Sequence, residues 1–161
     1  MARFLVVDLD GTLFDTNVRF ELCLKEVGAK SLSELAGAKR RQFWQCYQSS
    51  KYMGYDRLNE KVADLVRRAK ERGWTIIILT GRSEETQKQV TMQQLESNGI
   101  PYDQLIMRRP GDFRKDSDFK GEVIKELAAR GEVIVIDDSE DVRKILSGRS
   151  YAPDNIPSNV F

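Results

Sequence analysis

The sequence predicts an α/β fold in which a mostly parallel central sheet lies between two layers of helices. Short apolar runs rich in β-branched residues alternate along the chain with longer amphipathic segments. This alternation is typical of parallel strands connected by helices that cover both faces of the sheet. The chain has 161 residues, enough to bury one sizeable core. We therefore expect a single three-layer domain over residues 1–161.

The expected strands are apolar runs that end at polar residues or turns. Phe4–Val7 is an unbroken apolar run, which favours a strand that is buried on both faces. Three further runs predict strands at 75–80, 104–108 and 132–138. The proline-containing tail, 151–161, is expected to be a loop or an edge segment.

The expected helices separate these strands. Helical periodicity and terminal signals place them at 58–72, 83–97, 117–129 and 140–146. In the mostly polar second helix, we expect Val90, Met92 and Leu95 to face inward.

Residues 15–57 interrupt this regular alternation. Their pattern suggests two or three short helices, so we expect a small helical cap inserted after the first strand. The apolar residues available for a core of its own are Leu22, Leu24, Val27, Phe43, Trp44 and Tyr47. A surface on which nucleic-acid bases stack is the alternative use of the aromatic side chains.

Composition limits the chemistry more than it limits the substrate. With 26 Lys and Arg against 25 Asp and Glu, the net charge of +1 neither requires nor excludes a polynucleotide. The chain contains no His, so proton transfer falls to carboxylates, Lys, Tyr or Cys.

The two cysteines and the lack of long apolar stretches indicate the cellular compartment in which the protein works. Cys23 and Cys46 have no metal-binding spacing, and we expect them to be free thiols in a reducing compartment. No apolar stretch approaches the roughly 20 residues that cross a bilayer, and the opening MARF does not resemble a targeting segment. We therefore expect a cytoplasmic protein that does not bind membranes.

The most informative motif follows the first strand, where residues 4–13 read FLVVDLDGTL. Asp8 and Asp10 come at the carboxyl end of the strand, where both carboxylates can reach one site. One can act as a nucleophile while the other carries a proton. A calcium-binding loop is the disfavoured alternative. The twelfth residue counted from Asp8 is Arg19, where such a loop requires Glu, and Glu21, the twelfth from Asp10, lacks the Asp or Asn pattern before it.

Polar residues also follow two other strands. Thr80 lies at the end of one strand, and Asp137 and Asp138 end another. Carboxylates that meet at this edge of a sheet form a hard oxygen site suited to Mg²⁺. The alternative for the Asp137–Asp138 pair is the capping of the next helix. The Thr80 hydroxyl and the amides after it suit phosphate oxygens.

Four motifs resemble those of the haloacid dehalogenase superfamily in order and spacing. They are DLDGTL, LTGR, a lysine near a helix start, which we identify as Lys120, and IDDSE. The resemblance implies a Rossmann-like three-layer sandwich and a phosphatase in which Asp8 is the nucleophile and Asp10 the acid and base. It further implies Mg²⁺ held by Asp8, the main-chain carbonyl of Asp10 and Asp137, with Asp138 orienting the waters of the metal.

The stretch MRRPGDFRKDSDFK resembles the 3′-phosphatase domain of phage polynucleotide kinase. That resemblance implies functional roles for Asp116 and Lys120, and phosphate contacts by Arg19 and Arg82. Thr80 and Gly81 complete the implied phosphate-binding set. The sequence has no GxxxxGK[ST] motif, so no P-loop for ATP is expected.

Together these features predict a magnesium-dependent phosphomonoester hydrolase that acts through an aspartyl phosphate. The preferred substrate is the 3′ end of a polynucleotide. A small-molecule phosphatase such as a 5′-nucleotidase is the alternative, and a non-catalytic phosphate-binding module is a more distant one.

Overall fold

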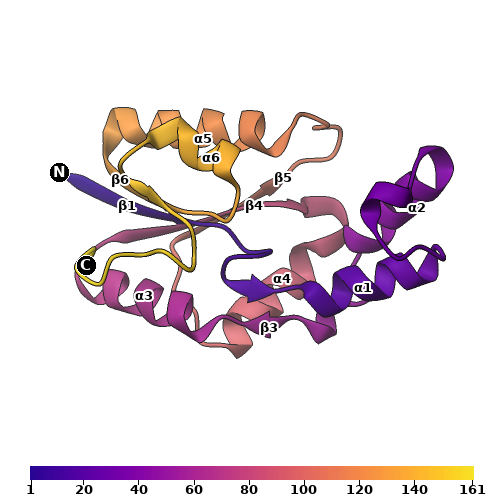
Figure 1. Ribbon diagram of the computed structural model, residues 1–161. Helices are drawn as coiled ribbons and strands as arrows, with labels where there is room; N and C mark the ends of the chain where they lie inside the picture. Colours follow the sequence, from indigo (N-terminus) through magenta and orange to yellow (C-terminus); the bar gives the residue numbers. More distant parts are fainter.

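The computed structural model describes all 161 residues, and its centre is a five-stranded parallel sheet (Figure 1). The strand order is β5-β4-β1-β6-β7. The strands are β1 (Ala2–Val7), β4 (Thr75–Ser83), β5 (Gln104–Arg108), β6 (Gly131–Ile136) and β7 (Ser150–Tyr151). Every pairing within this sheet is parallel. The expected sheet is confirmed, and the tail begins with its edge strand.

Helices cover both faces of the sheet (Figure 1). On one face lie α3 (Glu60–Glu71) and α4 (Glu84–Ser97), and on the other lie α5 (Asp116–Arg130), α6 (Glu140–Arg143) and the 3₁₀ turn η3 (Lys144–Leu146). Strand β1 alternates between them: Leu5 packs on the α3 side and Phe4 on the α5 side. The three-layer fold is thus confirmed. None of its helices is both long and apolar enough to span a bilayer.

The register of the central strands brings the predicted motifs together. Val7 pairs with Ile78 of β4 and with Ile136 of β6, so the chain leaves all three strands at nearly the same level. Strand β4 continues to Ser83, beyond the expected end at Thr80, and its register with β5 shifts after Leu79. Such an irregularity redirects side chains at the end of a strand.

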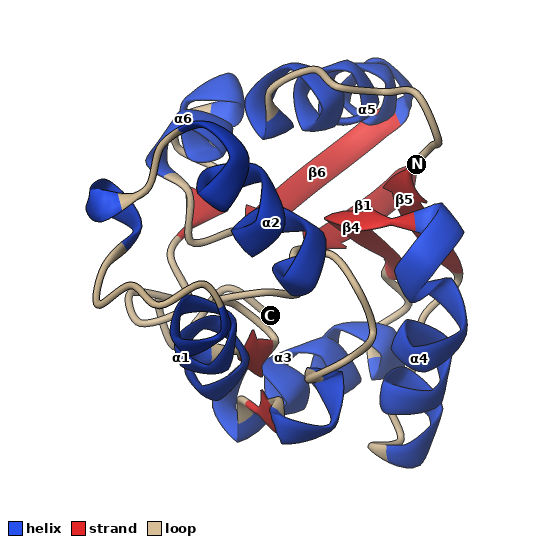
Figure 2. Ribbon diagram, turned by 90° about the vertical axis from the view of Figure 1, so that its right-hand side faces the viewer, coloured by secondary structure: helices blue, strands red, loops and turns tan.

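Residues 15–57 contain α1 (Asn17–Glu26), η1 (Leu32–Glu34), α2 (Gly37–Tyr47) and η2 (Met53–Tyr55). The two ends of this helical segment meet in a short antiparallel ribbon of β2 (Phe14–Asp15) and β3 (Arg57–Leu58). Figures 1 and 2 show that α1 and α2 lie beyond the carboxyl ends of the central strands. The segment therefore covers the edge of the sheet at which the motifs gather.

The helical segment has an apolar cluster of its own, centred on Phe43. The Phe43 ring lies 5.0 Å from that of Phe20 and 5.1 Å from that of Trp44. Leu22, expected in this cluster, lies outside it. Phe20, Leu24 and Val27 share one face of α1, and Leu22 falls on another.

The expectation of free thiols is wrong for this structure, in which Cys23 and Cys46 form a disulfide. Cys23 lies on α1 and Cys46 on α2, and their Cα atoms are 5.7 Å apart. The pairing could not be read from the sequence, because the two cysteines are 23 positions apart and only the packing of α1 against α2 brings them together. The disulfide also removes the observation on which the reducing compartment was inferred.

Helix α4 differs from its expected orientation. Leu95 is buried, but Met92 is 42% exposed, so the prediction that Met92 faces inward is wrong. Gln87 and Thr91 are buried in its place. The inner face of α4 is polar because it packs against charged groups at the carboxyl edge of the sheet.

We expect reduction of the Cys23–Cys46 disulfide to lower the free energy of unfolding by about 3 kcal/mol, because the bond closes a loop whose freedom it removes from the unfolded chain. Urea unfolding with and without a thiol reductant measures the effect. The Cys23→Ser/Cys46→Ser variant is the control and should not respond to the reductant. An equal midpoint for the wild-type protein in both conditions would contradict the disulfide.

Candidate active site

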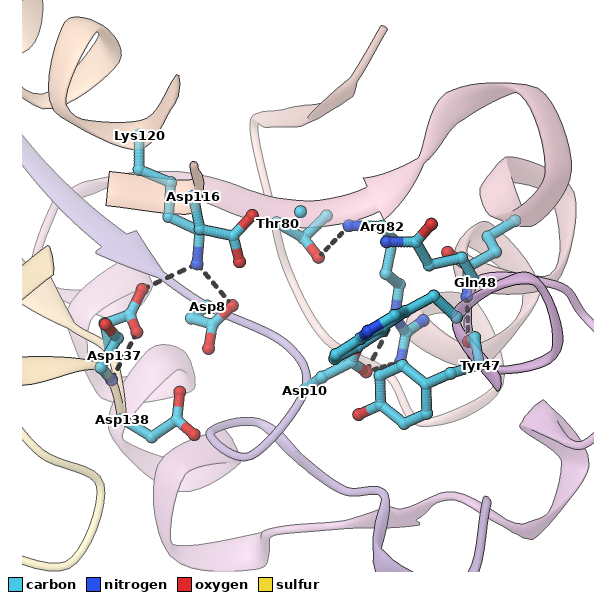
Figure 3. Close-up of a pocket in the computed structure, with 14 residues that line it drawn as sticks. Asp8, Asp10, Tyr47, Gln48, Thr80, Arg82, Asp116, Lys120, Asp137 and Asp138 are labelled. Atoms are coloured by element: carbon cyan, nitrogen blue, oxygen red, sulfur yellow. Dashed lines mark hydrogen bonds and ion pairs between the residues drawn. The ribbon is translucent and has the colours of Figure 1, made fainter. Parts of the chain in front are cut away.

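A cavity of about 310 Å³ lies where the central strands end and the helical segment begins (Figure 3). Nearly all the residues predicted for the site line it, namely Asp8, Asp10, Thr80, Gly81, Arg82, Asp116, Lys120, Asp137 and Asp138. The cavity is also lined by Trp44 and Tyr47, which are expected in the core of residues 15–57 or on a base-stacking surface, and by Gln48, Gln87 and Ser139, for which no role is predicted. Of the predicted residues, Arg19 alone is not part of the wall.

Lys120 joins the first and last of these motifs (Figure 3). Its Nζ donates to Asp8 Oδ1 at 2.9 Å and to Asp137 Oδ2 at 2.8 Å, and all three side chains are buried. Burial alone would lower the pKa of Lys120, but the two carboxylates outweigh it and raise the pKa. Burial also raises the pKa of Asp8 well above its ordinary value, against the opposing charge of Lys120. Lys120 therefore remains an ammonium ion.

The other oxygens of Asp8 and Asp137 are oriented by neighbouring hydrogen bonds. The Thr12 hydroxyl donates to Asp8 Oδ2 at 3.0 Å and accepts from the Asp138 amide at 3.1 Å. The Ser139 amide donates to Asp137 Oδ1 at 2.9 Å. Thr12 belongs to the DLDGTL motif but is not among the predicted site residues.

Gly11 allows the first and last motifs to approach each other. Its backbone has φ +81°, and a Cβ at this position would lie 2.3 Å from Asp138 Oδ2. Both the backbone conformation and the close contact require glycine.

Carboxylate oxygens of Asp8, Asp137 and Asp138 lie within 4.8 Å of one another, while the Asp10 carboxylate belongs to a different cluster. Lys120 brings one positive charge against these three acids, which leaves an excess of negative charge at a set of hard oxygen donors. This donor set fits Mg²⁺. A role for Asp10 at the metal is left to its main-chain carbonyl, as the motif resemblance implies.

The carboxylate of Asp10 is held by two arginines. Its Oδ1 accepts from Arg19 Nη2 at 2.5 Å, and from Arg82 Nη2 and Nε at 2.7 and 3.0 Å. Burial favours a higher pKa for Asp10, but the charges and hydrogen bonds of Arg82 and Arg19 outweigh it and hold the pKa below its ordinary value. In this arrangement Asp10 is an ionised carboxylate.

Asp56, which belongs to no predicted motif, completes this charged cluster. Its two oxygens accept from Arg19 Nε at 3.1 Å and Arg19 Nη2 at 3.0 Å, and Oδ2 also accepts from Arg82 at 3.3 Å and Gln94 at 3.1 Å. Its side chain is fully buried. Two buried arginines are thus balanced by the carboxylates of Asp10 and Asp56.

The remaining N–H groups of Arg19 and Arg82 also have partners. Arg82 Nη1 donates to Thr91 at 2.9 Å and to Gln94 at 2.7 Å, which explains the polar inner face of α4. Arg19 Nη1 donates to the main-chain carbonyl of Tyr47 at 3.0 Å, and its guanidinium lies 4.5 Å from the centre of the Tyr47 ring. Arg19 is fully buried behind Asp10, so its contact with phosphate stays a prediction.

The remaining predicted residues lie on the opposite wall. The Thr80 hydroxyl accepts from the Arg82 amide at 3.1 Å. A Cβ on Gly81 would lie 2.6 Å from Asp116 Oδ1, so the Asp116 side chain lies close to the Gly81 backbone where α5 approaches β4. Asp116 itself forms an ion pair with Arg108. It therefore anchors the loop before α5 at the rim of the cavity.

Comparisons with known proteins show what this chain is similar to. A family model described as the polynucleotide kinase PNKP phosphatase domain matches residues 33–147, more than half of the chain. No curated protein matches the sequence at a significant level.

Several solved structures share the fold. A chain of the Pnkp1/Rnl/Hen1 RNA repair complex is 26% identical with a TM-score of 0.67, and the match covers 94% of this chain but only 42% of that one. The haloacid dehalogenase-like hydrolase SP0104 from Streptococcus pneumoniae is 19% identical with a TM-score of 0.63, covering 92% and 81% of the two chains. A predicted phosphatase from Clostridium acetobutylicum is 15% identical with a TM-score of 0.67, covering 94% and 83%.

We expect Asp56→Asn to lower the free energy of unfolding by about 3 kcal/mol, because it leaves two buried arginines with one carboxylate between them. Asp64→Asn is the matched control. Asp64 pairs with Arg67 at 3.0 Å, but its side chain is 67% exposed, so its loss should change stability much less. Urea unfolding of both variants makes the comparison. Equally small changes would show that the Asp56 cluster contributes nothing to folding.

Proposed function

Because the chain belongs to the polynucleotide kinase PNKP phosphatase domain family of haloacid dehalogenase-type phosphatases, we propose that it removes the terminal 3′-phosphate from polynucleotides. The reaction depends on Mg²⁺ and passes through a phosphoryl group on Asp8. The observation that carries the mechanism is the buried contact of Lys120 with both Asp8 and Asp137, at 2.9 and 2.8 Å, in the wall of the cavity.

In the first step an oxygen of Asp8 attacks phosphorus, the bond to the 3′ oxygen breaks, and the sugar alkoxide leaves. Forming an aspartyl phosphate divides one difficult hydrolysis into two easier steps. Lys120 stabilises negative charge on the transferred group, together with the Thr80 hydroxyl and the amides near Gly81. Asp8, Asp137 and the main-chain carbonyl of Asp10 would hold Mg²⁺, with Asp138 beside it, and the ion would supply further neutralising charge.

Asp10 is the acid and base of the reaction, and the two arginines bound to its carboxylate control when it can be protonated. A phosphate dianion that enters the cavity competes with Asp10 for the guanidinium of Arg82, which lines the same wall. Asp10 then loses a charge that holds its pKa down, becomes protonated more readily and can give its proton to the leaving alkoxide. In the second step the ionised Asp10 takes a proton from a water that attacks phosphorus, the bond between phosphorus and the Asp8 oxygen breaks, and inorganic phosphate leaves while the Asp8 carboxylate is restored.

The family and the likeness to a chain of an RNA repair complex support a polynucleotide substrate. This chain spans less than half of that relative, so the substrate is carried over here as a proposal. A cavity of about 310 Å³ is at the small end of ligand sites. It suits a terminal phosphate and its sugar, with the rest of the polymer outside. We further propose that residues 15–57 act as a cap over one phosphatase domain, since they close the cavity with Trp44 and Tyr47.

We expect Asp8→Asn to reduce phosphate release by about 10³-fold or more, because an amide is a poor nucleophile at phosphorus. A chelator should abolish the wild-type activity, and added Mg²⁺ should restore it. A colorimetric phosphate assay measures both effects, and near-ultraviolet circular dichroism checks that the variant is folded. Unchanged release by folded Asp8→Asn would contradict the nucleophile assignment.

The substrate assignment is tested with a 3′-phosphorylated oligonucleotide, a 5′-mononucleotide and a sugar phosphate, each with Mg²⁺. We expect the oligonucleotide to have the highest kcat/KM. Reaction of the mononucleotide alone would refute the end-processing function and favour a 5′-nucleotidase, since the cavity is also large enough for a small ester.

A further inference from the structure

A second hollow, of about 700 Å³, adjoins the active-site cavity. Trp44, Gln48 and Asp116 line both spaces, so the second hollow continues from the mouth of the first. Its outer wall is the loop between β5 and α5, residues 109–115. We call this hollow the loop groove. A substrate larger than its reacting phosphate has a direct path from Asp8 into it.

The loop has a defined shape. The Asp112 amide donates to the Arg109 carbonyl at 3.1 Å across Pro110 and Gly111, and Gly111 has φ +82°. Proline followed by a glycine of positive φ is the pattern of a type II turn. Arg108 then donates to the carbonyls of Asp112 and Arg114 at 3.1 and 2.7 Å. The turn and these bonds fix the loop against the start of α5.

Two of the basic residues in the groove are already used by this loop. Arg108 pairs with Asp116, and Arg114 binds both carboxylate oxygens of Asp112 and reaches Glu122 at 2.6 Å. These arginines balance Asp112 and Asp116 within the protein. They are therefore structural and are not available to an incoming anion.

Three side chains of the loop remain without such partners. Arg109 and Lys115 are exposed and form no ion pair, and Phe113 is 93% exposed. Glu85 is the one acid of the groove with no ion pair, so the unpaired charges leave a net positive surface. A fully exposed phenylalanine on a fixed loop, flanked by two free cations, is an unusual feature of a protein surface.

We propose that the loop groove binds the nucleotides that precede the 3′-phosphate of a single-stranded polynucleotide. Phe113 and Trp44 offer ring faces on which bases stack, and Arg109 and Lys115 contact the backbone phosphates. A nucleotide chain presents a flat apolar base and an anionic phosphate at each step, which matches the groove in both respects. This inference rests on the proposed function, because it needs the 3′-phosphate at Asp8.

The test compares a 3′-phosphorylated single-stranded octamer with a 3′-phosphorylated mononucleoside. The wild-type protein should prefer the octamer. Phe113→Ala should raise the KM for the octamer about fivefold or more and leave the mononucleoside unchanged, whereas Phe113→Tyr should keep the preference. Tyr55→Ala removes another exposed aromatic ring, outside the groove, and should have no effect.

The roles of Arg109 and Lys115 are tested by a second measurement, the salt dependence of the reaction. Arg109→Gln and Lys115→Gln should each reduce the dependence of log(kcat/KM) for the octamer on log salt concentration by about 0.7. Lys61→Gln, which removes an exposed cation of α3 outside the groove, should leave that dependence unchanged.

The two possible failures are distinguishable. If the wild-type protein hydrolyses the octamer but the groove variants match it on both substrates, the groove proposal is overturned and the 3′-phosphatase function stands. If the wild-type protein hydrolyses the mononucleoside and not the octamer, the polynucleotide function fails and the groove proposal fails with it.

Discussion

The buried ammonium group of Lys120 is the interaction on which the rest of the site depends. It lies between Asp8, which follows β1, and Asp137, which follows β6. Without it, two carboxylates would be buried side by side, and the cost of desolvating two like charges would force them apart or protonate them. With it, two strand ends and the start of α5 converge on one point. One ammonium group against the three acids Asp8, Asp137 and Asp138 leaves the net negative charge that makes the site attractive to a divalent cation.

The sheet and the place of each motif at the end of a strand could be predicted from the sequence, because both depend on local patterns. Apolar runs mark the strands, and in parallel strands the residues that follow each run reach the same edge. Asp56 could not be predicted in this way. It lies in an irregular stretch after η2, and its role exists only because the chain returns to Arg19 and Arg82.

The errors have the same origin. Cys23 and Cys46 were interpreted by their spacing, whereas the packing of α1 on α2 decides that they meet. Met92 was assigned to the core because it is apolar, but α4 turns Thr91 inward to accept from Arg82. In each case a contact between distant segments overrode a local preference.

The short ribbon of β2 and β3 allows residues 15–57 to vary independently of the central sheet. All of residues 15–57 enter and leave through one paired stalk, Phe14 with Leu58 and Asp15 with Arg57. A helical segment of different length can be grafted there without altering the register of the sheet. Asp56 lies at the base of that stalk, however, and it neutralises arginines on both sides of the junction. A graft that omits an acid at this point would preserve the backbone arrangement of the junction but would leave the two arginines without the carboxylate that neutralises them.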